Sequence, residues 1–373
     1  MNKCQLVFTC MFKDRHNFNI EKLEGVKGNE EFIYAILPYV ARSFSLSIVV
    51  LPDKLSIPAA LGYCYCRILD TFEDMLIDPM MRETALRLLP RIIKKLIKNQ
   101  DCSADVKQIF NYEKYLVKTK KKDETYCLLV REINRINQVL CQQDHAVKDL
   151  IYRLVKKMSK GMIKNTGDYK EKKENITDKK IHKYCKSVLG YPLIFMCQLL
   201  QWSKGVQDYL HITYKKDIID FSQFIQLANI ARDVEEDLLN NIVYHNLLVP
   251  YKNKEERKNL EDPILKRHIR QARKELIIKA ISSITKIDFT ELVKIYLMDS
   301  YGIRLSILLF LSFSEIFYKN LSHKHYNIGS RCSHLVMIIR CIVLSVFSLT
   351  TKMGVERSIS ELINLRELLK YNN

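Results

Sequence analysis

The 373-residue sequence predicts an all-α protein, because helix breakers are scarce and strand patterns are missing from it. The chain contains only 10 glycines and 8 prolines, well below the roughly 12% that these residues make up in average proteins. Leucine, isoleucine, lysine and glutamate are abundant, and no stretch shows the period-2 alternation of a β-strand. We therefore expect long helices with short connections, arranged as a single-domain helical bundle.

The domain organisation is expected to be simple. Residues 1–30 are predicted to form an N-terminal arm, and residues 31–373 are predicted to form one all-helical domain. The chain is longer than most single domains but within reach of one large helical domain. No repeat with a period of 20–50 residues is visible in it.

The helices are expected in a regular order along the chain. The first is predicted at Glu30–Val40, interrupted near Pro38 or capped near Ser43. A loop at Pro52–Asp53 then precedes a long helix from about Ile57 to Met75. Apolar periodicity predicts the remaining helices at Met81–Lys98, Asp123–Gln142, Ala146–Met162, Lys180–Leu200, Ile218–Leu239, Pro263–Ser283, Phe289–Tyr318 and Cys332–Met353. The polar run Lys164–Lys180 is expected to be a loop or lid.

The net charge of +18 is spread over scattered lysine clusters with acids between them. No zinc-finger or RNP signature accompanies this charge, so we expect no nucleic-acid partner. Solvated surface accounts for most of the lysines. Attraction to an anionic membrane surface or to a diphosphate-bearing ligand is the alternative.

The 11 cysteines show no C-x-x-C motif and no disulfide framework. On a helix, Cys64 and Cys66 would lie roughly 160° apart, so they cannot jointly hold one ion. The cysteines are therefore predicted to be reduced core residues of a cytoplasmic protein.

Targeting and membrane segments are not expected. The N-terminus shows no signal-peptide pattern. The apolar stretch Arg304–Phe313 is too short for a span of about 20 residues, and His334–Leu349 carries Arg340 near its centre. Both are predicted to be buried core helices, and no transmembrane anchor is expected.

An acidic stripe lies within "YCYCRILDTFEDM" (Tyr63–Met75). Four residues spaced by 4, 3 and 4 share one face of the predicted helix: Tyr63, Arg67, Asp70 and Asp74. Asp70 and Asp74 repel each other, which an adjacent arginine or a bound cation would offset, and Glu73 lies at the edge. Taken alone, this pattern is more typical of a solvated helix face than of a Mg²⁺ site.

A second acidic stripe lies within "FIQLANIARDVEEDLLN" (Phe224–Asn240). Asn229, Asp233 and Asp237 fall at i, i+4 and i+8, flanked by Gln226, Arg232 and Glu236. The opposite face is apolar, and burying acids beside it is costly unless they pair or bind an ion. Two such helices predict a cavity with opposed cation sites.

Facing carboxylates that hold Mg²⁺, with arginines beside them, suit the binding of a diphosphate. Such a site would stabilise the diphosphate as it leaves, and an apolar wall would protect the resulting carbocation from water. The residues alone therefore predict Mg²⁺-dependent ionisation of a diphosphate ester.

Four segments, in the same order and at similar spacing, resemble the squalene/phytoene synthase family: "ARSFSLSIVVLP", "YCYCRILDTFED", "YCKSVLGYPL" and "QLANIARDVEED". The resemblance runs from about Tyr39 to Arg304. It implies an all-α isoprenoid synthase fold whose central cavity opens between the two acidic helices. It also implies head-to-head (1′-1) condensation of two prenyl diphosphates through a cyclopropylcarbinyl diphosphate.

The resemblance also implies roles for individual residues. Mg²⁺, or Mn²⁺ in its place, would be held by Asp70, Glu73, Asp74, Asn229, Asp233 and Asp237. The substrate would be bound by Arg42, Ser43, Tyr63, Arg67, Gln226 and Arg232. Tyr184 would assist proton transfer or steer the cation, and it joins Asp70, Asp74, Asp233 and Asp237 as the predicted catalytic residues. Ser43 as a simple helix cap and Tyr184 as a simple core residue remain alternatives.

The expected product is squalene, made from farnesyl diphosphate through presqualene diphosphate, because "DTFED" is closer to squalene synthases than to the phytoene-type motif. Squalene formation would require NADPH. A phytoene or dehydrosqualene synthase, which needs no reductant, and a non-catalytic family member acting as a partner are the alternatives.

The sequence departs from the family in two places. The segment "LLNNIVYHNLLVP" lacks the arginine that the family commonly carries there, which puts one diphosphate contact in doubt. The C-terminal anchor of eukaryotic squalene synthases is not visible either, so a soluble, bacterial-type enzyme is the better likeness. Peripheral membrane contact is a further expectation, since it would help to release an apolar product.

Overall fold

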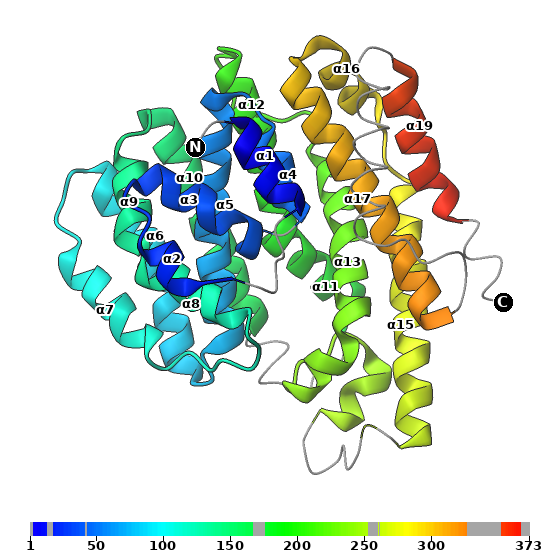
Figure 1. The fold of residues 1–373 in the computed structure, drawn as a ribbon. Coiled ribbons are helices and arrows are strands. Elements are labelled where there is room, and N and C mark those ends of the chain that lie inside the picture. Colours follow the sequence, from blue (N-terminus) through cyan, green and yellow to red (C-terminus); the bar gives the residue numbers. More distant parts are fainter. Residues whose placement is uncertain are drawn as a thin grey trace. The chain divides into compact units, whose positions relative to one another are not determined.

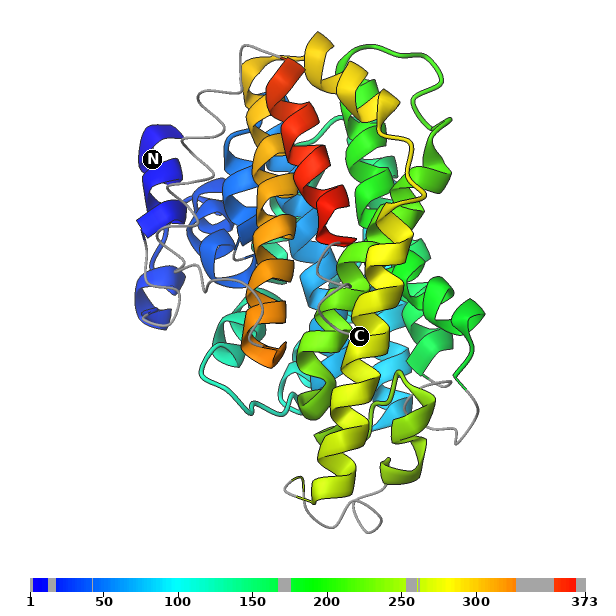
Figure 2. The same ribbon diagram turned by 90° about the vertical axis from the view of Figure 1, so that its right-hand side faces the viewer.

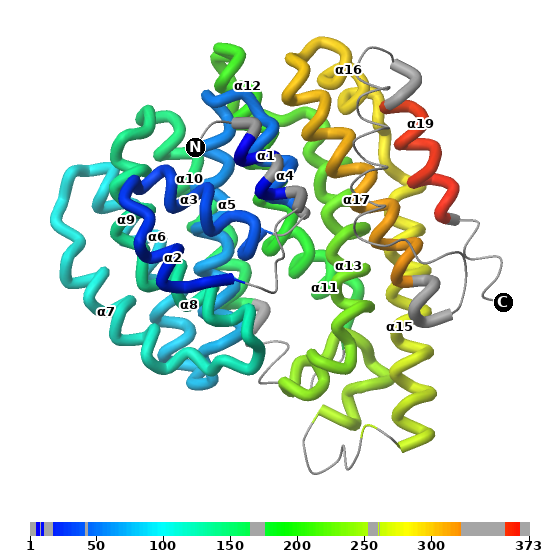
Figure 3. Tube along the Cα trace, in the orientation of Figure 1, coloured from blue at the N-terminus to red at the C-terminus, as the bar shows by residue number. Residues whose placement is uncertain are grey.

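The computed structural model describes residues 3–12, 18–41, 43–166, 176–252, 260, 262–326 and 352–366. Throughout this part of the chain every regular element is a helix, which confirms the predicted all-α class (Figure 1). By their contacts the residues form two compact units, and the chain enters each more than once (Figure 3). Unit 1 comprises residues 1–163, 191–213 and 300–307, and unit 2 comprises residues 164–190, 214–299 and 308–373. The predicted boundary at residue 30 stays a prediction.

Unit 1 is built around one long helix, α5 (Asp53–Met75), which packs against α3, α6, α8 and α12. The helices of this unit are α1 (Lys3–Phe12), α2 (Ile20–Glu24), α3 (Asn29–Val40), α4 (Ser43–Val49), α5, α6 (Pro79–Ile97), α7 (Ser103–Glu113), α8 (Asp123–Arg131), α9 (Ile133–Cys141), α10 (His145–Thr166, of which residues to 163 belong here) and α12 (Tyr191–Ser203).

The residues of α5 that face away from the acidic stripe pack in the core of unit 1. Cys64 and Cys66 are buried and form no disulfide, which confirms the packing role predicted for them. Burial raises the pKa of the Cys64 thiol to about 12, so this thiol stays protonated at neutral pH. At Gly62, a Cβ atom would lie 2.6 Å from the Phe195 ring. Glycine therefore permits the close approach of α12 to α5.

Unit 2 contains two long helices, α13 (Lys215–Leu239) and α15 (Pro263–Ile284), which run side by side (Figure 2). The other elements are α11 (Asp178–Cys185), the π-helical turn η2 (Lys186–Gly190), the 3₁₀ turn η3 (Asn246–Tyr251), α16 (Thr290–Met298), α17 (Tyr301–Tyr326, of which residues from 308 belong here), α19 (Lys352–Ile363) and the 3₁₀ turn η4 (Asn364–Arg366).

Three helices that were predicted to be continuous are interrupted in the structure. The helix expected at Asp123–Gln142 is divided at Glu132, whose ψ of 18° takes the backbone out of the α region. The helix expected at Phe289–Tyr318 is divided at Asp299, which is extended with a ψ of 168°. The helix expected at Lys180–Leu200 contains the π turn Lys186–Gly190, which periodicity cannot distinguish from an α-helix.

Other differences concern the ends of elements and elements that were not expected. Pro38 lies inside α3 without ending it, and Ser43 begins α4. Helices α1, α2, α4 and α7 were not predicted. The helix expected at Cys332–Met353 falls outside the described residues except for its last two positions, where α19 begins.

One segment among the described residues, Tyr301–Leu321 of α17, is long and apolar enough to cross a membrane. In its most apolar window 56% is buried, and a core helix of a soluble protein passes the same test. The apolar run Arg304–Phe313 thus lies within helix α17. The second apolar run, His334–Leu349, lies outside the described residues.

Candidate functional site

The acidic stripe of unit 1 forms one connected set of polar contacts along α5. Arg67 donates from its Nη2 to the Tyr63 hydroxyl (2.9 Å), and its Nη1 lies 3.4 Å from Oδ2 of Asp70. The Tyr63 hydroxyl in turn donates to the carbonyl of Val40 (3.0 Å) on α3. Side-chain exposure is only 24% for Arg67 and 28% for Asp70. Arg67 and Asp70 are therefore only partly solvated, whereas Asp74 at the end of the stripe is exposed.

Arg67 is held by an aromatic neighbour that the sequence analysis missed. Its guanidinium lies 5.0 Å from the ring centroid of Tyr126 on α8, and Tyr126 is buried. The Nε atom of Arg67 is buried and has no hydrogen-bond partner among the described residues. An unpaired buried donor is costly, so Arg67 is suited to accept an anionic ligand. No spacing in the sequence connects Tyr126 with Arg67.

Asp70 is a weaker acid than an ordinary aspartate. Burial, with a smaller contribution from the charge of Asp74, raises the pKa of Asp70 to about 6, although Arg67 opposes the shift. Glu73 is buried and Asp74 is exposed. The carboxylate of Asp70 is therefore held in its charged form at a cost, which a neighbouring cation would reduce.

The acidic stripe of unit 2 also contains an arginine–aspartate pair. Arg232 binds Asp233 through both carboxylate oxygens, with 2.7 Å between Nε and Oδ1. Its guanidinium also lies 5.3 Å from the ring centroid of Phe317 on α17. Burial lowers the pKa of Arg232, but Asp233, Asp237 and Glu236 together raise it above its usual value.

The other polar groups of this stripe are half-buried. Asn229 donates to the side-chain oxygen of Gln226 at 3.3 Å, and Asp237 is partly exposed one turn after Asp233. The structure thus places the predicted residues of α13 on neighbouring turns of one helix, as the spacing required.

Arg273 on α15 fixes the position of α13 and was missed by the sequence analysis. Its buried Nε donates to the carbonyl of Ala231 (2.8 Å), and its Nη2 pairs with Glu235. Ala231 and Glu235 lie on either side of Asp233 in the sequence, so Arg273 locks the part of α13 that carries the acids. Within "RQARKE" nothing distinguishes this arginine from a surface residue.

Tyr184 lies in the last turn of α11, directly before the π turn. Its ring contacts Tyr244, with 5.1 Å between ring centroids. Tyr244 belongs to the segment in which the family's arginine is missing. Single π turns are frequent at functional sites, and the half-buried Tyr184 does not behave as a fully buried core tyrosine.

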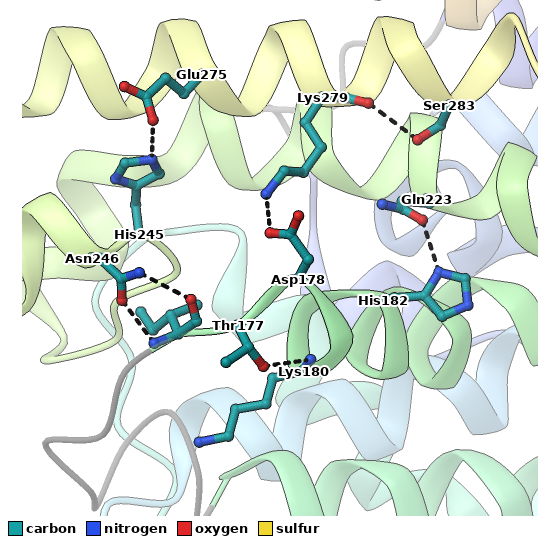
Figure 4. A network of polar contacts seen from close by, with 11 residues as sticks. Thr177, Asp178, Lys180, His182, Gln223, His245, Asn246, Glu275, Lys279 and Ser283 are labelled. Atoms are coloured by element: carbon teal, nitrogen blue, oxygen red, sulfur yellow. Dashed lines mark hydrogen bonds and ion pairs between the residues drawn. The ribbon is translucent and has the colours of Figure 1, made fainter.

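His245 and Asn246, which follow Tyr244, contact helix α15 and the residue Ile176 just before α11 (Figure 4). Asn246 accepts a hydrogen bond from the Ile176 N–H (2.7 Å) and donates to the Ile176 carbonyl (3.1 Å). His245 contacts Glu275 on α15 at 2.9 Å. These contacts hold the beginning of α11, the helix that carries Tyr184, against the elements that follow α13.

Two predicted substrate-binding residues are not tested by the structure. Arg42 lies outside the described residues, and the side chain of Ser43 also lies outside them, although the backbone of Ser43 begins α4. Their roles stay predictions, as does a cavity between the two acidic helices.

The donor set of the two stripes fits Mg²⁺ or Mn²⁺, because it consists of hard carboxylate and amide oxygens. Burial raises the pKa of Asp70 to about 6, and a bound cation would favour its charged form. Within the part of the chain that the structure describes, no group of three or more His, Cys, Asp or Glu side chains converges on one point. Mg²⁺ commonly completes its coordination with oxygens from water and from a ligand.

Solved structures define the class of fold. A structure of TcSQS with the ligand E5700 aligns over 92% of this chain and 99% of its own, with a TM-score of 0.59 and 16% sequence identity. A second TcSQS complex, with the ligand BPH1237, aligns over the same shares with a TM-score of 0.56. The chain therefore has the all-helical fold of these proteins.

The family model for squalene/phytoene synthases matches residues 37–274. The chain therefore belongs to the squalene/phytoene synthase family, a family of prenyltransferase-type enzymes. This confirms the resemblance found in the four sequence motifs.

The curated relatives are distant. Squalene synthase BSS of Botryococcus braunii is 27% identical over 222 residues, which cover 58% of this chain and 43% of that protein. Lycopaoctaene synthase of the same organism is 25% identical over 223 residues, which cover 60% of this chain and 45% of that protein. The chain thus spans less than half the length of these relatives.

Proposed function

We propose that the protein is a Mg²⁺-dependent prenyltransferase that joins two prenyl diphosphates head to head (1′-1). The preferred substrate is farnesyl diphosphate, and the products are presqualene diphosphate and then squalene. Membership of the squalene/phytoene synthase family supports the reaction type. The "DTFED" motif supports the choice of squalene over the phytoene-type products.

One observation carries the proposal: each acidic helix holds an arginine against the carboxylate that is predicted to bind metal. Arg67 contacts Asp70 on α5, and Arg232 contacts Asp233 on α13. A carboxylate-bound cation and an arginine fork together bind the oxygens of a diphosphate, the carboxylates through the metal and the arginines directly. A non-catalytic partner would not need this arrangement on both helices.

The chain's own residues would act on the diphosphate and on the cation that it leaves behind. Arg67, with its unpaired Nε, and Arg232 would bind diphosphate oxygens and stabilise the charge that develops as the carbon–oxygen bond breaks. At each stripe, Mg²⁺ held by that stripe's own carboxylates, Asp70 and Asp74 on α5 or Asp233 and Asp237 on α13, would add positive charge to the diphosphate oxygens. Tyr184, restrained by Tyr244, would face the reacting carbons and accept or return a proton.

The identity of the product is the most specific part of the proposal. Squalene formation would consume a hydride from NADPH, whereas phytoene or dehydrosqualene formation would not. The similarity to lycopaoctaene synthase, at nearly the same identity as to squalene synthase, favours testing substrates of more than one chain length.

The experiment is an incubation of the purified chain with Mg²⁺ and either farnesyl or geranylgeranyl diphosphate, with and without NADPH. The products are identified by mass. Squalene formed only with NADPH, and presqualene diphosphate formed without it, is the expected result. A C40 product would show that geranylgeranyl diphosphate rather than farnesyl diphosphate is the substrate. If neither substrate is condensed, the proposed reaction is wrong.

Matched variants test the residues. Asp70→Asn and Asp233→Asn keep the shape of each side chain and remove the charge, so each should reduce turnover by at least about a hundredfold. Glu83→Gln, at an exposed carboxylate of α6 that pairs with Arg87, is the control and should retain most of the activity. Unchanged turnover in Asp70→Asn and Asp233→Asn would show that the metal assignment is wrong.

A further inference from the structure

The π turn η2 (Lys186–Gly190) packs against α13 at a point where the two elements approach closely. A Cβ atom at Gly190 would lie 3.2 Å from Oγ of Ser222, which is closer than Cβ atoms ordinarily approach another atom. The backbone of Gly190 is not left-handed, and glycine weakens a helical turn compared with alanine. Glycine therefore suits this position because it has no side chain.

Ser222 has little freedom to move away from Gly190. It is fully buried, and its hydroxyl donates to the carbonyl of Ile219 at 2.6 Å. A larger residue at position 190 would push the hydroxyl out of this hydrogen bond, and a buried hydroxyl without a partner is costly. The contact between Gly190 and Ser222 therefore fixes the distance between the π turn and α13.

Ser222 also lies on the polar stripe of α13. Four residues spaced by 4, 3 and 4 share one face of this helix: Ser222, Gln226, Asn229 and Asp233. Asn229 follows Ser222 by seven positions, which is about 10 Å along the helix axis. The π turn thus contacts α13 about two turns before the first predicted metal ligand of that helix.

A second contact ties the same segment to α13, at the residue after Ser222. Nδ1 of His182 on α11 lies 2.8 Å from Oε1 of Gln223 (Figure 4). Tyr184 lies between the two contacts in sequence, two residues after His182 and six before Gly190. A single contact would allow the segment to pivot. Two contacts fix both its position along α13 and its rotation about its own axis.

We propose that Gly190 and Ser222 are positioning residues for Tyr184. Their contact determines where along α13 the Tyr184 side chain lies, and so its distance from the acids that are predicted to bind metal. Neither residue needs to touch a substrate, because the effect passes through the backbone between Tyr184 and Gly190. The consequence for catalysis rests on the proposed function, in which Tyr184 acts on the reacting carbons, whereas the position of Tyr184 is measured without it.

The direct test places 3-fluorotyrosine at position 184 alone and records its fluorine NMR resonance in the full chain. Gly190→Ala should shift this resonance, because the new methyl group displaces the turn or the Ser222 hydroxyl. Gly190→Ala with Ser222→Ala should return the resonance most of the way, because the second change removes the Oγ atom that the methyl group meets. No substrate is needed, so the result does not depend on the proposed reaction.

Ser283→Ala is the matched control for this rescue. Ser283 is buried, as Ser222 is, and its hydroxyl donates within its own helix, to the carbonyl of Lys279 on α15 at 3.1 Å. Gly190→Ala with Ser283→Ala should therefore keep the shifted resonance. If Gly190→Ala does not fold, Ser222→Thr enlarges the same contact from the side of α13 and should also shift the resonance.

Steady-state kinetics measure the consequence for the proposed reaction. Gly190→Ala should lower kcat for the condensation at least about tenfold and change the KM for the prenyl diphosphate less than about twofold, because the groups that bind diphosphate stay in place. Gly190→Ala with Ser222→Ala should recover most of kcat, and Gly190→Ala with Ser283→Ala should not.

Three results would overturn the proposal. The first is an unshifted resonance in both Gly190→Ala and Ser222→Thr, which would mean that other contacts position Tyr184. The second is a shift that Ser222→Ala does not reverse, or that Ser283→Ala reverses equally well. The third is an unchanged kcat in Gly190→Ala although the resonance shifts and the unmodified protein condenses prenyl diphosphates. A lack of condensation by the unmodified protein would instead contradict the proposed function, and the resonance would still decide what positions Tyr184.

Discussion

At the scale of single residues, the charged carboxylate of Asp70 lowers the stability of the folded chain. Its pKa of about 6 in the folded chain exceeds the ordinary 3.8, so the folded state binds the proton more tightly than the unfolded state does. The charged carboxylate therefore destabilises the fold above about pH 6, and this cost disappears as the pH falls through the folded pKa toward about 4.

Asp70→Asn should accordingly stabilise the metal-free protein at alkaline pH. The carboxylate keeps 28% of its exposure, so water screens part of the cost and a gain of about 1 kcal/mol in the free energy of unfolding is expected. Urea unfolding at pH 8 and at pH 4 with a chelator present measures it, and the gain should vanish at the lower pH. Equal stability of the two proteins at pH 8 would contradict this account.

Loss of the Tyr126 ring should weaken substrate binding, because this ring holds Arg67 in place. Replacing it with leucine removes the ring that lies 5.0 Å from the guanidinium, while phenylalanine keeps that ring. A cation–π contact of this kind contributes about 0.5–2 kcal/mol. Tyr126→Leu is therefore expected to raise the KM for the prenyl diphosphate by about twofold to thirtyfold, with a smaller effect on kcat.

Tyr126→Phe is the matched control, and its steady-state kinetics should resemble those of the unmodified protein. If both variants raised KM equally, the hydroxyl rather than the ring would position Arg67. If neither did, Arg67 would be held by Tyr63 and Asp70 alone.

At the scale of elements, the contacts after α13 determine how firmly α11 is held. Asn246→Ala removes both hydrogen bonds to Ile176, and two such partly exposed bonds contribute about 1 kcal/mol together. Amides of α11 (Asp178–Cys185) should therefore exchange with deuterium several-fold faster in this variant, whereas amides of α15 should not change.

Asn246→Asp separates the two bonds, because it keeps the acceptor for the Ile176 N–H and loses the donor. Its α11 exchange should fall between that of Asn246→Ala and that of the unmodified protein. Exchange of α11 that is unaffected in both variants would show that the Tyr184–Tyr244 contact is sufficient to hold this helix.

The elements also show what the sequence could and could not predict. Long helices such as α5, α6, α13 and α15 were placed within a few residues, because their apolar periodicity is continuous and their breakers are few. Glu132 and Asp299 divide helices although neither is a helix breaker, so propensity could not reveal the divisions. The acids of the site followed from their spacing on single helices, whereas Tyr126 and Arg273 come from other helices and have no local signal.

At the scale of the whole molecule, the charge of +18 suits anionic ligands and anionic surfaces. Arginines beside the two acidic stripes would provide positive charge for a diphosphate. The same composition suits an anionic surface and an anionic ligand, so the sequence alone could not separate the two.

Metal binding should depend on the diphosphate. Mg²⁺ is usually bound through one or two carboxylates together with substrate phosphates and waters, so we expect protein groups alone to hold it weakly. At each stripe, inorganic diphosphate would complete the coordination beside the arginine of that stripe, Arg67 on α5 or Arg232 on α13. A ligand that binds only the folded state raises Tm, and at a hundredfold excess over its Kd it adds about 2.7 kcal/mol to the free energy of unfolding.

We therefore expect Tm to rise by several degrees with Mg²⁺ and diphosphate together and almost not at all with either alone. Differential scanning calorimetry measures this rise. Asp70→Asn and Asp233→Asn should each abolish the joint rise, whereas Glu83→Gln, at an exposed carboxylate of α6, should retain it. The full rise with Mg²⁺ alone would show that the protein provides a complete metal site.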